Sequence, residues 1–348
     1  MNRPKLNEIL NRFLSLKTNK IYTLPIVILM PHSSCNCRCV MCDIWKSNSS
    51  VQQLKESDIS GLLNSLRKLK TKCLVMSGGE ALLHPNFFKL CDILNSNNIS
   101  ITVLSTGLLL KKYAKDIINK TNEVIVSLDG SETVHNKIRN IPNAFNKLKE
   151  GISEIKALNR NYRITGRCVI QKDNFKDLQN IIVSAKEIGL DQISFLTADV
   201  TTEAFNRPNL WSDDKIADIK LSLEELPIFK KIIDKILKEN FKDFKNGFIA
   251  ESQNKFRNFY SYYAYFCEKS DLPKVSCNAP WVSTVIEPDG SVRPCFFHKI
   301  IGNIKTEELG DILNSETAVN FRKELDIKTN PICKKCVCSL NLSPISKV

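Results

Sequence analysis

The sequence lacks a long hydrophobic run, a cleavable leader pattern and internal repeats. Its longest strongly apolar segment, 24–30, is too short to cross a bilayer and contains Pro25. The N-terminal stretch MNRPKLNEILNRFLSLKTNK is polar and basic, without the apolar core and small-residue cleavage site of a signal peptide. No low-complexity linker interrupts the chain. These absences exclude a membrane-spanning or fibrous protein, and we expect a cytoplasmic protein that has no membrane partner.

The net charge of +13 comes from 50 basic residues against 37 acidic ones. Such an excess is typical of proteins that bind nucleic acid or a membrane surface. However, no basic run is interleaved with base-stacking aromatic residues, and the lysines are scattered along predicted helices. We therefore interpret the charge as a solvated, lysine-rich surface and do not expect nucleic acid as a partner. An anionic substrate or carrier is the alternative.

Cysteine is abundant, with 13 residues in a chain of 348. The odd count and the crowding at 35–42 and 333–338 do not suit a framework of disulfides. In a reducing compartment, cysteines in this arrangement indicate metal or redox chemistry.

Short apolar segments alternate with longer amphipathic ones between residues 20 and 198. This alternation predicts an α/β fold, in which crossover helices connect parallel strands. In βα barrels the functional residues lie at the carboxyl ends of the strands. The predicted strands are 25–31, 73–77, 99–105, 123–128, 163–170 and 191–197. The predicted helices lie near 56–70, 86–96, 109–119, 143–158 and 174–188.

Three cysteines after the first predicted strand form the most informative motif. Cys35, Cys39 and Cys42 have C-x3-C-x2-C spacing, which lets one short loop bind three corners of a four-iron (4Fe-4S) cluster. Three thiolates leave one iron of that cluster free for another ligand. A zinc site with Cys37 as the fourth thiolate is the alternative that the spacing leaves open.

The motif and its context resemble the radical S-adenosylmethionine (SAM) superfamily. In that family the free iron binds SAM, and an electron from the cluster releases a 5′-deoxyadenosyl radical. After the second predicted strand, Ser77-Gly78-Gly79-Glu80 matches the GGE motif that holds the amino group of SAM. The resemblance therefore assigns Gly78, Gly79 and Glu80 to cofactor binding. The family usually has proline where this chain has Ala81, a difference that affects the turn and not the ligand.

A second stretch that resembles the family follows the fourth predicted strand. Ser127-Leu128-Asp129-Gly130, with His135 and Arg139 downstream, looks like the S-x-D-G…H-x-x-x-R stretch of relatives that carry a C-terminal cluster domain. Ser127 and Asp129 alternate to the same face of the strand. The resemblance assigns Ser127 to cofactor binding and makes Asp129, His135 and Arg139 candidate catalytic residues. For His135 the alternative is a structural hydrogen bond.

The C-terminal region resembles the SPASM and twitch extensions of the same superfamily. Two apolar segments flank a strong turn signal at 287–290, which predicts a hairpin. The spacing Cys277-x12-Gly290-x4-Cys295 carries the resemblance. It implies a second 4Fe-4S cluster that four thiolates close completely. The expected ligands are Cys277, Cys295, Cys333 and Cys336.

Two further cysteines leave this ligand set open. Cys338 or Cys267 could replace one of the four ligands, and a stabilising zinc in the same thiols is another alternative. A full SPASM domain carries additional cysteines, but Leu342 stands where the next one would fall. The extension therefore looks like the shorter twitch type, with one auxiliary cluster.

The sequence thus predicts a partial (β/α)6 TIM-like barrel and a small α+β domain of the twitch or SPASM type. The barrel is expected to hold the SAM-binding cluster, and the small domain the auxiliary cluster. The expected parts are an N-terminal extension at 1–24, the radical SAM core at 25–198, a helical and aromatic connecting segment at 199–270 and the auxiliary domain at 271–348.

The resemblance implies a radical SAM oxidoreductase that uses SAM and two 4Fe-4S clusters, the second as electron acceptor or relay. The twitch enzymes include one that oxidises an aminocyclitol, so the first hypothesis is oxidation of a small polar substrate such as a sugar or cyclitol. The alternative is a maturase that modifies a ribosomally synthesised peptide. Either enzyme would need a flavodoxin- or ferredoxin-type reductant. A non-catalytic iron–sulfur carrier would have no use for Glu80.

Overall fold

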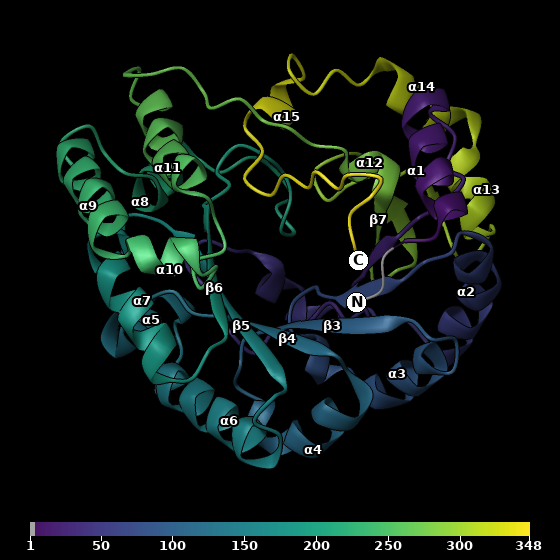
Figure 1. Ribbon diagram of the computed structural model, residues 1–348, viewed down its shortest axis with the longest axis horizontal. Helices are drawn as coiled ribbons and strands as arrows, with labels where there is room; N and C mark the ends of the chain where they lie inside the picture. Colours follow the sequence, from purple (N-terminus) through teal and green to yellow (C-terminus); the bar gives the residue numbers. More distant parts are fainter. Residues whose placement is uncertain (1–3) are drawn as a thin grey trace.

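A curved sheet of nine strands, covered by helices on its outer side, organises the protein (Figure 1). The computed structural model describes residues 4–348. The strand order is β6-β5-β4-β3-β2-β1-β7-β8-β9, and the neighbours from β6 to β7 are parallel. The strands are β1 (Ile26–Leu29), β2 (Cys73–Met76), β3 (Ser100–Ser105), β4 (Glu123–Ser127), β5 (Arg163–Ile170), β6 (Gln192–Thr197), β7 (Ser283–Ile286), β8 (Ser291–Arg293) and β9 (Gly302–Asn303).

Alternation of side chains along each strand separates the two faces of the sheet. In β1, for example, Val27 and Leu29 are fully buried, whereas Ile26 and Ile28 are only partly buried. The buried face packs against the crossover helices, as expected for a parallel sheet. The helices of the first 200 residues are α1 (Leu6–Thr18), α2 (Glu56–Lys68), α3 (Phe87–Asn95), α4 (Leu110–Lys120), α5 (Glu132–Arg139), α6 (Ala144–Leu158) and α7 (Leu178–Glu187). The later helices are α8 (Asp213–Ile219), α9 (Leu226–Glu239), α10 (Phe241–Lys245), α11 (Gln253–Tyr265), α12 (Ala279–Val282), α13 (Leu309–Asn314), α14 (Glu316–Glu324) and α15 (Pro331–Lys334).

The predicted fold class is confirmed, because all six expected strands and all five expected crossover helices are present in the expected order. Helix α5 was not predicted. Its buried residues are His135, Ile138 and Arg139, so two of the three that face the core are polar. A helix that buries polar side chains has a weak hydrophobic pattern, which is why its sequence gives little signal.

The C-terminal region continues the barrel sheet, a connection that the sequence did not predict. Strand β7 pairs in parallel with β1, from Ile26 opposite Ser283 to Leu29 opposite Ile286. The predicted hairpin is present, since β7 and β8 are antiparallel around a turn that ends at Gly290. Gly290 has a φ of +92°, a conformation that glycine adopts without strain.

Helix α11 carries many of the aromatic residues of the expected helical and aromatic connecting segment, 199–270. Its aromatic side chains are mostly buried, and Phe256 packs edge-on against Phe195 of β6 at a ring distance of 5.4 Å. The hydroxyl of Tyr262 donates to the carbonyl of Ala198, just after β6. The hydroxyl of Tyr263 donates to the carbonyl of Ile170 at the end of β5. The segment is therefore a packed helix that fixes the carboxyl ends of β5 and β6.

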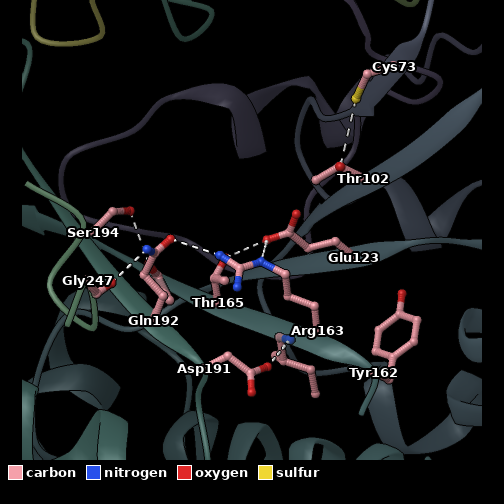
Figure 2. Close-up of polar contacts among 12 residues, drawn as sticks. Cys73, Thr102, Glu123, Tyr162, Arg163, Thr165, Asp191, Gln192, Ser194 and Gly247 are labelled. Carbon is pink, nitrogen blue, oxygen red and sulfur yellow. Dashed lines mark hydrogen bonds and ion pairs between the residues drawn. The ribbon is translucent and has the colours of Figure 1, made fainter. Parts of the chain in front are cut away.

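Polar side chains connect neighbouring strands at the opposite end of the barrel (Figure 2). Glu123 begins β4 and accepts hydrogen bonds from Arg163 (3.0 Å) and Thr165 (3.3 Å) of β5. Arg163 also donates to Gln192 of β6, whose side-chain amide donates to the carbonyl of Gly247. These contacts lie at the amino ends of the strands, so this end is held by polar contacts between strands and lies away from the functional loops.

The N-terminal extension forms helix α1, which contacts α12 of the C-terminal region. Its end is fixed there, because Trp281 donates to the side chain and Arg322 to the carbonyl of Asn19. The first three residues of the predicted extension, 1–3, lie outside the described residues. In the part that the structure describes, 4–348, no helix combines the length and the apolar character needed to span a membrane.

Candidate functional site

The loop that carries Cys35, Cys39 and Cys42 follows β1 at the carboxyl end of the sheet. Cys39 is buried, and Cys35 and Cys42 are partly exposed. A hydrogen bond from the Cys37 thiol and the positive charge of Arg139 lower the pKa of Cys39 to about 6. Hydrogen bonds with Cys35 and Cys39, together with burial, raise the pKa of Cys37. Burial also raises the pKa of Cys42 to about 12, so these shifts do not separate the expected ligands from Cys37.

Backbone hydrogen bonds hold the cysteine loop from two sides. The amide of Glu80, after β2, donates to the carbonyl of Ser34 at 2.9 Å. On the other side, the amides of Arg38 and Val40 donate to the last turn of α5, each at 3.1 Å. The loop is therefore fixed before any ligand binds, which is the condition for a preorganised cluster site.

The two glycines of the Gly78-Gly79-Glu80 motif are required by the close approach of the cysteine loop. A Cβ atom at Gly79 would lie 2.3 Å from the carbonyl oxygen of Ser34 and 3.0 Å from the Cβ of Cys35. Gly78 has a φ of +110°, and a Cβ atom there would lie 2.9 Å from the carbonyl oxygen of His32. The motif therefore supports the cysteine loop directly, beyond any contact that it makes with a cofactor.

Glu80 is completely buried, and its carboxylate faces the end of β3. It accepts hydrogen bonds from the amide and hydroxyl of Thr106, at 2.7 and 2.6 Å, and from the hydroxyl of Ser105. The amide of Leu82 donates to it as well, at 3.2 Å. Burial raises the pKa of Glu80, although these hydrogen bonds act in the opposite direction. Glu80 thus joins the ends of β2 and β3 at the site.

The three candidate catalytic residues form one buried cluster next to the cysteine loop. Arg139 pairs with the Asp129 carboxylate and donates to the Cys39 sulfur at 3.4 Å. The other Asp129 oxygen accepts from the amide of Val169 at 2.8 Å. His135 Nδ1 accepts from the amide of Asp129, and burial lowers the pKa of His135 to about 3. His135 thus uses Nδ1 in a structural hydrogen bond, its buried Nε2 has no partner within residues 4–348, and the catalytic roles of His135, Asp129 and Arg139 stay predictions.

Arg167 is a candidate residue that the sequence did not reveal. It stands on β5 directly opposite Ser127 of β4 in the register, so both side chains face the inner side of the sheet. Its side chain is partly buried, and within residues 4–348 its buried Nε has no hydrogen-bond partner. An arginine beside a serine hydroxyl at this level fits a carboxylate ligand.

The four cysteines expected to bind the auxiliary cluster line a single cavity. Burial raises the pKa of Cys295 to about 11 and that of Cys333 to about 12. Neither Cys338 nor Cys267 is among the residues of the described chain that line this cavity. The cavity residues are Val275, Cys277, Pro280, Cys295, Phe297, His298, Ile327, Ile332, Cys333 and Cys336.

The residues of this cavity suit an iron–sulfur cluster. Thiolates that bind different irons of a cluster surround a volume. The four cysteines around an otherwise largely apolar cavity therefore fit a 4Fe-4S cluster.

The segment 199–212 connects the cysteine loop with the C-terminal region, and we call it the connecting loop. Phe205 packs on Phe296 at a ring distance of 4.9 Å, one residue after Cys295. The next residue, Asn206, donates from its side chain to Ser47 at 2.8 Å, just after the cysteine loop. Both Phe205 and Asn206 have a φ of +62°, the left-handed region, which is strained for phenylalanine and which asparagine adopts more readily.

Buried charges hold the connecting loop in this strained conformation. Arg207 and Asp199 form an ion pair at 2.8 Å, and their side chains are 1% and 2% exposed. The Arg207 guanidinium stacks on the ring of Trp211 at 3.7 Å. The indole nitrogen of Trp211 in turn donates to Asp43, which follows Cys42. The loop thus contacts both cysteine-bearing turns.

Fold and site together define a βα-barrel protein of the iron–sulfur class, with one cysteine loop at the end of the first strand and a second four-cysteine cavity. Two family models match this chain: the radical SAM superfamily at residues 29–185 and the SPASM iron–sulfur cluster-binding domain at residues 277–337. The chain belongs to the radical SAM superfamily and carries a C-terminal SPASM domain. Its cofactors are accordingly SAM and iron–sulfur clusters.

Characterised relatives are similar at low identity. The cysteine-type anaerobic sulfatase-maturating enzyme of Clostridium novyi is 24% identical over 347 residues, which cover 90% of this chain and 85% of that enzyme. The sporulation killing factor maturation protein SkfB of Bacillus subtilis is 20% identical, and the match covers 88% of this chain and 67% of that protein. The AdoMet-dependent heme synthase of Methanosarcina barkeri is 25% identical over 165 residues, and the match spans only 46% of that enzyme.

A solved structure shows the same fold. Streptococcus suis SuiB, bound to its precursor peptide SuiA, superposes with a TM-score of 0.64 at 13% identity, covering 95% of this chain and 76% of that one.

We predict that Gly79→Ala displaces the cysteine loop, because the new Cβ would meet backbone atoms that cannot move aside cheaply. Iron bound after anaerobic reconstitution should fall from about eight per chain to about four, the content of the auxiliary cluster alone. Gly61→Ala is the matched control, since a Cβ at Gly61 of α2 meets nothing within 4 Å. Full iron binding by Gly79→Ala would contradict the prediction.

We predict that Arg139→Gln lowers the free energy of unfolding by about 3 kcal/mol, because Asp129 is left buried without a counter-charge. Urea denaturation under anaerobic, reducing conditions measures this change. Lys111→Gln is the control, because Lys111 forms an ion pair with Glu150 in which both side chains are more than half exposed. Lys111→Gln should lower the free energy of unfolding by less than about 0.5 kcal/mol. Equal losses of unfolding free energy in Arg139→Gln and Lys111→Gln would contradict the prediction for the Asp129–Arg139 pair.

Proposed function

We propose that this protein is a peptide maturase, which uses SAM-derived radical chemistry to modify a side chain of a peptide or protein substrate. The observation that carries the proposal is the similarity to the sulfatase-maturating enzyme over 90% of this chain and 85% of that one. The maturation protein SkfB supports the same substrate class. The sugar or cyclitol hypothesis has no comparable support from the relatives, so we adopt the peptide alternative.

We propose that Cys35, Cys39 and Cys42 hold the SAM-binding 4Fe-4S cluster, and that the four cysteines of the C-terminal cavity hold the auxiliary one. When bound, the first cluster and SAM together supply the 5′-deoxyadenosyl radical that abstracts hydrogen from the substrate. The proposal rests on the C-x3-C-x2-C spacing, the fixed loop and the convergence of Cys277, Cys295, Cys333 and Cys336 on one cavity.

We propose that the chain binds SAM across the carboxyl ends of β2 to β5. Gly78 and Gly79 let the backbone approach the cysteine loop closely. The guanidinium of Arg167 and the hydroxyl of Ser127 are proposed to bind the carboxylate of SAM. Glu80, which accepts hydrogen bonds from Thr106 after β3, is proposed to hold the amino group of SAM. Asp129 and Arg139 hold Cys39 and the loop in place.

A peptide oxidised by loss of one hydrogen atom must lose a second electron and a proton to give a stable product. The auxiliary cluster is the proposed acceptor of that electron, because four thiolates leave none of its irons open for a substrate. An external flavodoxin- or ferredoxin-type protein is the proposed reductant. All thirteen cysteines are free thiols, which is consistent with the reducing cytoplasm as the proposed compartment.

We predict that anaerobically reconstituted protein binds about eight irons per chain and forms 5′-deoxyadenosine from SAM and dithionite. Parallel incubations with a synthetic peptide library and with a panel of sugars and aminocyclitols, each deuterated at carbon, identify the substrate class. Deuterium should appear in 5′-deoxyadenosine only with peptides.

The control is the triple variant Cys35→Ala/Cys39→Ala/Cys42→Ala, which should keep about four irons and form no 5′-deoxyadenosine. Deuterium transfer from a sugar or cyclitol, with none from peptides, would overturn the proposed substrate class. Formation of no 5′-deoxyadenosine by the unaltered protein would overturn the radical reaction itself.

A further inference from the structure

His298 is a buried histidine in the turn that carries Cys295. Two hydrogen bonds fix the backbone of this turn at His298. Its amide donates to the carbonyl of Cys295 at 3.3 Å, and its carbonyl accepts from Arg293 at 2.9 Å. The backbone at His298 is therefore tied both to an expected cluster ligand and to strand β8.

The imidazole of His298 is held by packing as well. It is 7% exposed, and it lies edge-on to Phe321 of α14 at a ring distance of 4.9 Å. The ring lines the same cavity as the four cysteines. A side chain that is packed, shielded from water and pointed into the cavity has one orientation available.

That orientation places Nε2 of His298 3.4 Å from the sulfur of Cys333. A thiolate has no proton to give and can only accept a hydrogen bond. When Cys333 is a thiolate, the proton between these two atoms is therefore carried by the imidazole, and Nε2–H is the donor.

We propose that His298 donates a hydrogen bond from Nε2 to the Cys333 thiolate, and by this bond raises the reduction potential of the auxiliary cluster. A reduced cluster carries one more negative charge than an oxidised one, so a donor at its sulfur stabilises the reduced form more. Hydrogen bonds to the sulfurs are among the factors that set the potential of such clusters. The inference rests on the proposed auxiliary cluster and assigns His298 a positioning role toward it.

The role suits the proposed reaction. An electron acceptor in the C-terminal cavity must have a potential high enough to take the electron from the substrate. The cavity is otherwise lined mainly by apolar side chains, which do not stabilise the added charge. Besides the cysteines, His298 is the polar side chain among the described residues of this lining, and it acts together with the backbone amides of Ala279 and Cys338, which donate to Cys277 and Cys336.

The test uses the full chain in the Cys35→Ala/Cys39→Ala/Cys42→Ala background, so that only the auxiliary cluster is present. Redox titration followed by electron paramagnetic resonance gives its midpoint potential. Relative to unaltered His298, the variant His298→Leu should show about a tenfold lower ratio of reduced to oxidised cluster at a fixed potential, which is about 59 mV for one electron. His298→Gln keeps an N–H donor of similar reach, and should restore most of the difference.

A second measurement needs no substitution at His298. In protein labelled with 15N-histidine, pulsed electron paramagnetic resonance of the reduced auxiliary cluster should show a weak coupling to one nitrogen, as a hydrogen-bonded ring gives. A strong coupling would mean that His298 is bound to iron, and would overturn the proposal.

The remaining outcomes are distinct from one another. Unchanged potentials in His298→Leu, with iron content intact, would overturn the role of His298 and leave the auxiliary cluster standing. Equal shifts in His298→Leu and His298→Gln would also overturn it, because the donor would then not be the cause. Absence of about four irons from the triple-alanine background would overturn the auxiliary cluster itself.

Discussion

The structure depends on the pairing of one short strand, β1, with partners from both halves of the chain. β1 has four residues, and it pairs in parallel with β2 on one side and with β7 on the other. The ladder continues beyond it, because the carbonyl of Leu29 accepts from Ser77 and the amide of Met30 donates to Ile286. The cysteine loop begins where this central strand ends, so its first residues are set by a strand that cannot shift without breaking two ladders at once.

Buried polar contacts then fix the loop beyond the strand. Glu80 and Asp129 are both fully buried carboxylates, and both are satisfied by several donors from neighbouring strand ends. Removing a donor from such a group is costly, because a buried acceptor without a partner keeps its full desolvation penalty. These two residues therefore act as fixed points that hold the ends of β2 to β5 in register around the cysteines.

The C-terminal region is tied to the barrel by more than the sheet. The connecting loop contacts both cysteine-bearing turns through consecutive residues, Phe205 and Asn206, in an unfavourable backbone conformation. Local strain of about 1–3 kcal/mol per residue persists only where surrounding contacts over-determine it. Here the buried pair Arg207–Asp199 provides such contacts. These contacts give the two cysteine-bearing turns a fixed relation to each other.

By itself, the sequence determined the barrel, its strand order, the C-terminal hairpin and the two groups of cysteines. Hydrophobic periodicity and motif spacing are local properties, because they involve residues that are near one another in the sequence. Helix α5, the pairing of β7 with β1 and the position of Arg167 opposite Ser127 were decided only by tertiary structure. The same holds for the hydrogen-bond partners of Glu80: the motif assigns this residue to cofactor binding by resemblance, and the fold adds donors from Ser105 and Thr106. The physical reason is that strand register and hydrogen-bond partners depend on residues far apart in sequence, whose proximity no local pattern encodes.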